Sequence, residues 1–169
     1  MYVERGIMIE KARQFAISHH LDQMYGNRPY AFHLDQVASL LEPYGETAQV
    51  IGYLHDVVED TTVTLEQVEK DFSLKVAACV AILTDEQGAT RKERKEKTYK
   101  KMAGVSGDTE LALIVKVADR LANTLSCIAD GKTDLLKVYQ SEFDAFYKAA
   151  YRQELCDELW ERLKAATFT

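Results

Sequence analysis

The chain has 169 residues, of which 47% are hydrophobic and 28% charged, with a formal net charge of −6 at pH 7. This length and apolar content predict a single domain over 1–169, and the acidic balance argues against a nucleic-acid-binding protein. No stretch approaches the ~18 consecutive apolar residues of a membrane span. The N-terminus has no basic region followed by an apolar run, so it does not resemble a signal peptide. We therefore expect a cytoplasmic protein with no membrane partner and no nucleic-acid partner.

Hydrophobic periodicity predicts helices throughout the first half of the chain. They are expected over about 3–24, from about 31 to 42, and over 46–59, 64–72 and 73–83. Gly26 and the residue before Pro29 resist helix and mark a loop. Thr64, followed three residues later by Gln67, is typical of a helix N-cap, and Ser73 is expected to cap the next helix.

The second half of the chain is also expected to be helical. A cationic block over 91–102 stands out in an otherwise acidic protein. An apolar helix over 111–128 should end at Gly131 as a glycine C-cap, and further helices cover about 133–166 with one break. No strand, repeat or low-complexity linker is visible, so we predict an all-α fold, a compact multi-helix domain with its motifs over about 20–125.

Four polar side chains interrupt the apolar helix expected over 46–59. His55 and Asp56 are adjacent, and Glu59 and Asp60 follow one helical turn later, so these pairs share a face. Burying such groups unpaired costs several kcal/mol each or forces them to lose their charge. A divalent metal ion is the simplest positive partner. The alternative is a helix end that projects its acids into solvent.

Two other helices add polar groups to apolar faces. The second helix supplies His33 and the helix over 111–128 supplies Asp119. Arg120 faces a different direction, so it is not expected to pair with Asp119. Two imidazoles and two carboxylates suit Mn²⁺, Fe²⁺ or Zn²⁺ with open positions for water, whereas Ca²⁺ prefers more oxygen ligands and no histidine.

Together these residues resemble a known family. His33, His55-Asp56 and Asp119 spell the order H…HD…D, which is similar to the HD-domain metal-dependent phosphohydrolases. The segments 28–33, 55–61 and 116–123 (RPYAFH, HDVVEDT and KVADRLAN) resemble more narrowly the hydrolase domain of the RelA/SpoT enzymes and the small alarmone hydrolases of the Mesh type. The resemblance runs from about 20 to 125.

This resemblance implies a mechanism. It assigns one Mn²⁺ to His33, His55, Asp56 and Asp119, where the ion would polarise the scissile phosphate and acidify a water. It implies that Glu59 and Asp60 orient and deprotonate that water. The implied reaction removes pyrophosphate from the 3′ position of (p)ppGpp, a small-molecule nucleotide, and leaves GDP or GTP.

A substrate with several phosphate charges also needs cations. Arg91, Lys95, Lys100 or Lys101 of the cationic block are the local supply, with a solvated helix face as the alternative for each. Asn123 lies one turn after Asp119 and resembles a substrate contact of the family; a core hydrogen bond is its alternative.

One departure from the family pattern concerns the base. The family has a basic residue that stacks on guanine, and here Tyr25 stands in its place in a slightly shorter loop. Either Tyr25 stacks on the base in its own way or Arg28 approaches from the other side. The adenosine alarmone (p)ppApp, NADPH and other nucleotides therefore remain alternative substrates, and a non-catalytic nucleotide-binding regulator is a further alternative. The sequence does not specify the oligomeric state.

Overall fold

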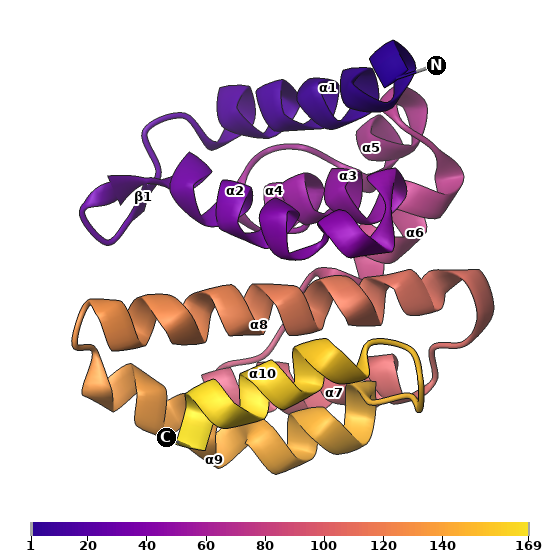
Figure 1. The fold of residues 1–169 in the computed structure, drawn as a ribbon. Helices are drawn as coiled ribbons and strands as arrows, with labels where there is room; N and C mark the ends of the chain where they lie inside the picture. The colour runs from indigo at the N-terminus through magenta and orange to yellow at the C-terminus, as the bar shows by residue number, and fades with distance from the viewer. Residues whose placement is uncertain (1, 169) are drawn as a thin grey trace.

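Helices from the N-terminal half form one group on one side of the molecule. In the computed structural model, which describes residues 2–168, this group lies above a long central helix (Figure 1). It consists of α1 (Tyr2–His20), α2 (Tyr30–Leu40), α3 (Glu46–Leu54), α4 (Val57–Asp60), α5 (Leu65–Asp71), α6 (Leu74–Leu83) and the short 3₁₀ helix η1 (Glu42–Tyr44).

The central helix is α8 (Leu111–Ala129). It packs against α2, α3 and α6 on one side and against α9 and α10 on the other. The remaining elements are α7 (Arg91–Ala103), the 3₁₀ helix η2 (Gly107–Glu110), α9 (Thr133–Ala150) and α10 (Asp157–Phe168). Most residues of α8 are buried, as expected for a helix surrounded by others. The predicted all-α fold is confirmed, and within the described residues no helix is both long and apolar enough for a membrane span.

Several predicted helix ends are confirmed in detail. The Thr64 hydroxyl accepts from the backbone N–H of Gln67 at 3.2 Å, and the Ser73 hydroxyl accepts from Val76 at the same distance. After α8 the chain turns at Gly131, whose φ of 66° lies in the left-handed region that favours glycine. These caps fix where α5, α6 and α8 begin or end.

The expectation of no strand is wrong at one place. Met24–Tyr25 (β1) and Arg28–Pro29 (β2) pair as a small antiparallel hairpin, with Gly26 at φ 62° in the turn. Helix α1 accordingly ends at His20 rather than near residue 24. Strands of two residues carry no alternating pattern, so periodicity could not reveal them.

The helix predicted over 46–59 is broken at its most polar point. Helix α3 ends at Leu54, α4 begins at Val57, and His55 and Asp56 form a turn between them. Asp56 has φ −105° and ψ 0°, outside the ideal helical region. The apolar residues continue across this turn with little change of spacing, which explains why the sequence predicted one continuous helix.

Candidate metal and substrate site

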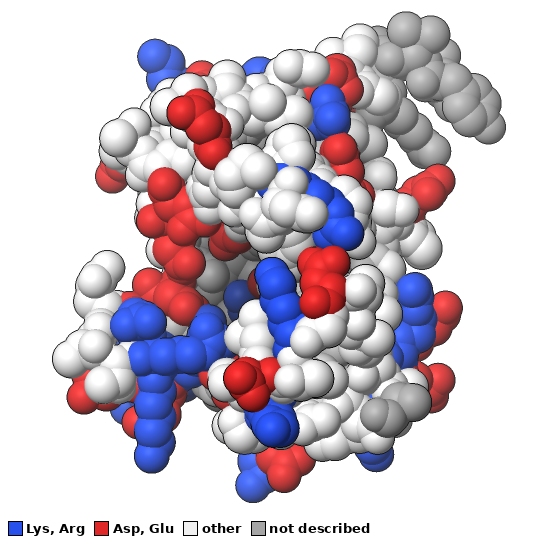
Figure 2. Space-filling model, turned by 90° about the vertical axis from the view of Figure 1, so that its left-hand side faces the viewer, with Lys and Arg blue, Asp and Glu red and all other residues white. Residues whose placement is uncertain are grey.

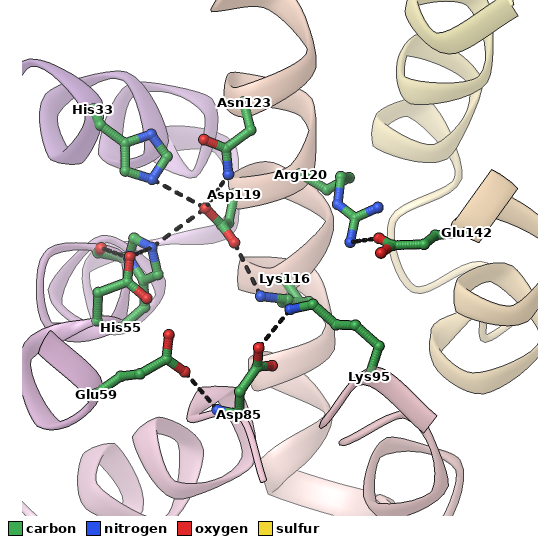
Figure 3. Close-up of polar contacts among 12 residues, drawn as sticks. His33, His55, Glu59, Asp85, Lys95, Lys116, Asp119, Arg120, Asn123 and Glu142 are labelled. Atoms are coloured by element: carbon green, nitrogen blue, oxygen red, sulfur yellow. Dashed lines mark hydrogen bonds and ion pairs between the residues drawn. The ribbon is translucent and has the colours of Figure 1, made fainter. Parts of the chain in front are cut away.

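Three parts of the fold bring His33, His55, Asp56 and Asp119 together. His33 comes from α2, His55 from the turn after α3, and Asp119 from the middle of α8 (Figure 3). Asp56 follows His55 in the same turn. His33 Nε2 lies 3.0 Å from Asp119 Oδ1, and His55 Nε2 lies 3.3 Å from the same oxygen and 3.0 Å from Asp56 Oδ2. Both imidazoles are almost fully buried.

The hydrogen bonding of His55 fits a metal ligand. Its Nδ1 lies 2.6 Å from the Gly52 carbonyl oxygen, so Nδ1 carries a proton, and in the neutral ring Nε2 is the nitrogen that presents a lone pair to a metal. That lone pair is buried without a hydrogen-bond partner and faces two carboxylate oxygens. Lone pairs that face one another in this way are stabilised by a positive charge between them, which a proton on Nε2 supplies in the metal-free chain and a metal ion can supply in its place. The ligand atoms of His33, His55 and Asp119 all lie within 4.8 Å of one another, so these residues form a possible metal site.

Lys116 is a member of this cluster that the sequence interpretation did not assign. Its buried Nζ lies 3.1 Å from Asp119 Oδ2. Burial alone would raise the pKa of Asp119, but Lys116 and His55 outweigh burial and hold that pKa well below its usual range. In turn, burial opposes the charge of His55, while Asp56 and Asp119 raise its pKa well above the usual value. The spacing of three residues between Lys116 and Asp119 was the available signal.

Asp56 is held by Tyr30, the first residue of α2. The Tyr30 hydroxyl donates to Asp56 Oδ2, and burial followed by the nearby Asp56 charge raises the pKa of Tyr30. Tyr30 therefore remains a hydrogen-bond donor at all ordinary pH values. Nothing in the pattern of the sequence alone indicated this bond, which joins residues on either side of α3.

Glu59 and Asp60 point in different directions. Glu59 lines the cavity beside the cluster, and its Oε1 accepts from the backbone N–H of Asp85 at 2.6 Å. Asp60 accepts instead from the Gln23 side chain at 2.9 Å, near the end of α1. Burial raises the pKa of both carboxyl groups and the charge of Asp56 adds to it, while the hydrogen bond from Asp85 to Glu59 and that from Gln23 to Asp60 oppose the shift.

The cavity has a volume of about 350 Å³ and walls of opposite charge. Figure 2 shows the hollow with acidic side chains gathered above it and basic side chains below it. The acidic residues that line it are Asp56, Glu59, Asp85, Glu86 and Asp119. The basic residues, all from α7 and α8, are Arg91, Arg94, Lys95, Lys116 and Arg120. Such a cavity suits an anionic ligand that meets a metal ion on one side and cations on the other.

Of the four expected phosphate contacts in α7, Arg91 and Lys95 line this cavity, and Lys100 is exposed outside it. Lys95 Nζ lies 2.6 Å from Asp85 Oδ2, and Arg91 donates to Glu142 from 2.7 Å. Lys101 does not line the cavity: its Nζ donates to the carbonyl oxygens of Ala81 and Thr84 at the end of α6 and pairs at 2.8 Å with Glu86, which does line it. Lys101 therefore caps a helix C-terminus in this structure.

Of the remaining expected substrate contacts, one lines the cavity and two do not. Asn123 lines the cavity and donates from Nδ2 to Asp119 Oδ1 at 3.0 Å. Tyr25 and Arg28 are not among the lining residues. Arg28 pairs with Asp130 at 3.3 Å and lies over the Phe32 ring.

Arg120 points away from the cluster, as expected from its position. It extends towards Glu142, with a distance of 3.0 Å between Arg120 Nη2 and Glu142 Oε2 (Figure 3). Its guanidinium also lies over the Tyr139 ring, 4.6 Å from the centroid. Arg120 thus connects α8 to α9 rather than neutralising Asp119.

An all-α fold with two buried histidines and two aspartates around one point defines the class of metal-dependent HD-domain proteins. A family model described as an HD domain matches residues 12–155, and the chain belongs to this family. The resemblance inferred from the sequence is thereby confirmed. An HD domain implies a divalent metal ion, which agrees with the possible site at His33, His55 and Asp119. The extension of one domain to 1–169 remains a prediction.

Two curated relatives are similar to this chain over most of its length. The chain is 29% identical over 160 residues to a probable guanosine-3′,5′-bis(diphosphate) 3′-pyrophosphohydrolase of Synechocystis sp., which covers 91% of this chain and 21% of the relative. It is 34% identical over 116 residues to the guanosine-3′,5′-bis(diphosphate) 3′-pyrophosphohydrolase MESH1 of Danio rerio, covering 64% of this chain and 63% of the relative. The chain thus spans about a fifth of the length of the first curated relatives that it matches.

A solved structure has a similar fold over nearly the whole chain. It is described as "A metazoan ortholog of SpoT hydrolyzes ppGpp and plays a role in starvation responses". The TM-score is 0.70 at 25% identity, and the match covers 92% of this chain and 94% of the other. The similarity therefore includes α9 and much of the C-terminal region, beyond the motifs that the sequence displayed.

Proposed function

We propose that this protein hydrolyses the 3′-pyrophosphate of guanosine alarmones, converting (p)ppGpp to GDP or GTP and pyrophosphate. The observation that carries the proposal is one cavity that joins the buried histidine–aspartate cluster, the carboxylate of Glu59 and a cationic wall. The relatives named as 3′-pyrophosphohydrolases support the same reaction.

We propose Mn²⁺ as the metal ion, with His33, His55, Asp56 and Asp119 as its ligands. When bound, such an ion supplies a Lewis acid for the scissile phosphate and acidifies the attacking water. Nitrogen and oxygen donors in equal number suit this choice. Lys116 and Tyr30 would keep the two aspartates oriented by holding the oxygen atoms that they contact.

Glu59 is the proposed acceptor of the water's proton. Its carboxylate lines the cavity, the Asp85 N–H holds one of its oxygens, and its raised pKa brings it closer to neutrality, where a general base is most effective. Asp60 is the second acid of the proposed pair. Because Gln23 holds Asp60 and Asp60 does not line the cavity, we assign proton transfer to Glu59 and orientation to Asp60.

Arg91 and Lys95 are the proposed phosphate-binding cations, and Asn123 is a proposed substrate contact. Each cation already pairs with a carboxylate, Arg91 with Glu142 and Lys95 with Asp85. A polyphosphate that enters the cavity offers both of them a second anionic partner. Neither Arg28 nor Lys101 lines the cavity, and each already has partners, so the proposal assigns no phosphate to them.

The same proposal describes the partner and the location. A small-molecule nucleotide is the substrate, no nucleic acid is bound, and the protein acts in the cytoplasm. The net charge of −6 supports the exclusion of nucleic acid.

The test is pyrophosphate release from ppGpp and from ppApp, side by side, with Mn²⁺ and with EDTA. Asp56→Ala is the inactive variant, and Asp22→Ala, an exposed aspartate outside the cavity, is its matched control. We expect Mn²⁺-dependent release from ppGpp in the wild type and in Asp22→Ala, lost in Asp56→Ala. Wild-type protein that binds Mn²⁺ but releases no pyrophosphate from ppGpp would refute the proposal.

A further inference from the structure

Tyr25 lies behind the cavity wall and touches two of the residues that form it. Its ring stacks on the His33 imidazole, with 4.7 Å between centroids and 15° between planes. Its hydroxyl donates to Asn123 Oδ1 at 2.7 Å. His33 and Asn123 line the cavity and Tyr25 does not. One half-buried side chain therefore supports two residues of the site without facing its interior.

The hydrogen bond from Tyr25 continues through Asn123 to Asp119. Asn123 accepts with its Oδ1 from Tyr25 and donates with its Nδ2 to Asp119 Oδ1 at 3.0 Å. An amide oxygen that accepts on one side fixes the amide so that its NH₂ group faces the other side. Asp119 Oδ1 is the same oxygen that faces His33 Nε2 and His55 Nε2. The Tyr25 hydroxyl is thus two hydrogen bonds away from the atom at the centre of the cluster.

The β1–β2 hairpin holds Tyr25 in this position. Tyr25 pairs with Arg28 across the two strands. The guanidinium of Arg28 pairs with Asp130 at the end of α8 and lies 4.4 Å from the centroid of the Phe32 ring in α2. These contacts fix the hairpin to the two helices that carry His33, Asn123 and Asp119.

We infer that Tyr25 is a positioning residue of the metal centre. Its ring fixes the plane of His33, and its hydroxyl, through Asn123, fixes Asp119. The inference rests on the proposed function, because it takes His33 and Asp119 as metal ligands. It replaces the expectation that Tyr25 stacks on the nucleobase, since the ring already stacks on His33 and lies outside the cavity lining.

The inference is tested by Mn²⁺ binding to the full chain after its metal has been stripped with EDTA. Isothermal titration calorimetry compares the wild type, Tyr25→Phe, Asn123→Ala and the double variant. Residues that hydrogen-bond to metal ligands change metal affinity by about 10–100-fold. Because Tyr25 acts through Asn123, we expect about a tenfold loss in Tyr25→Phe. In the Asn123→Ala background the same change should have no further effect, because the connection to Asp119 is already broken.

Tyr53→Phe is the matched control. The Tyr53 hydroxyl donates to Asp35 at 2.8 Å, so this variant loses a similar hydrogen bond outside the cluster. We expect it to keep wild-type Mn²⁺ affinity, while thermal melting shows whether both variants lose similar stability. A Tyr25→Phe variant with wild-type affinity, or an equal loss in both Asn123 backgrounds, overturns the inference. A wild-type protein that binds no Mn²⁺ refutes the proposed function itself, which distinguishes the two failures.

Discussion

At the scale of single residues, the site depends on how each buried charge is matched. Asp119 has a cation, Lys116, on one oxygen and two imidazoles and an amide on the other. The sequence interpretation selected Asp119 because an aspartate inside an apolar helix needs a partner, and in the structure its carboxylate has several. It did not select Lys116, because lysine is common and its burial depends on neighbours that are distant in sequence.

The structure predicts different roles for the two acids after the His-Asp pair. Replacement of Glu59 by Gln removes the proposed general base and should lower kcat by about 10²–10⁴-fold. Asp60→Asn should lower kcat less, since Asp60 contacts Gln23 and not the cavity. Steady-state kinetics with ppGpp at saturating Mn²⁺ measures both, and calorimetry checks that each variant still binds the metal. Equal losses in the two variants would contradict this assignment.

Lys116 should matter most when no metal is bound. Lys116→Met removes a buried cation and leaves Asp119 without its partner, which costs about 3–5 kcal/mol for a broken buried pair. Mn²⁺ should restore part of this stability, because a ligand that binds only the folded state stabilises it. Denaturant unfolding with EDTA and with Mn²⁺ measures both values, with the exposed Lys100→Met as control. A Lys116→Met variant as stable as wild type in EDTA would show that the pair contributes nothing.

At the scale of elements, polar contacts join α9 to the helices that form the cavity. Glu142 pairs with Arg91 of α7 and with Arg120 of α8. The sequence predicted α8 and α9 from their apolar periodicity and singled out the segment of α7 as a cationic helix. It could not predict this connection, because periodicity places a residue on a face but does not say which helix that face meets. The same limit explains Lys101, which was correctly placed in a helix but points to the end of α6.

The connection through Glu142 predicts a dependence of stability on pH. Burial would raise the pKa of Glu142, but Arg91 and Arg120 outweigh it and lower the pKa below the ordinary 4.5. A carboxyl group with a lowered folded-state pKa stabilises the fold above the unfolded-state pKa, and this contribution is lost as the pH falls through the folded-state pKa. The difference in free energy of unfolding between wild type and Glu142→Gln should therefore be largest near pH 7 and shrink below about pH 4.5.

Urea unfolding of both proteins between pH 7 and pH 3 measures this difference. Glu161→Gln, on α10 and exposed, is the control and should follow the wild type throughout. A difference that stays constant with pH would mean that the Glu142 carboxylate does not contribute through its charge.

At the scale of the whole molecule, the site lies where the N-terminal group of helices meets α7 and α8. The acidic wall comes mainly from the turn after α3, from α4 and from the loop after α6, and the basic wall comes from α7 and α8. His33 and Asp119 are 86 residues apart in sequence. That these two residues lie close together was predictable because the order of histidines and aspartates resembles a family. The physical pattern of the sequence alone showed only that polar residues interrupt apolar helices.

The parts that could not be predicted have a common cause. The hairpin around Tyr25 is too short to carry a pattern, the turn at His55-Asp56 is hidden within continuous apolar spacing, and the bond between Tyr30 and Asp56 crosses from one helix to another. Each depends on tertiary contacts. These features orient the candidate metal ligands that the sequence interpretation had selected.

A crystal structure of the Mn²⁺-loaded protein with anomalous diffraction data would show directly whether this cluster is the metal centre. We predict one strong anomalous peak between His33 Nε2, His55 Nε2 and the carboxylates of Asp56 and Asp119, with Glu59 facing the same cavity. A protein that crystallises with Mn²⁺ at another place, or with no peak among these four side chains, would contradict the central claim that this cluster is the metal centre.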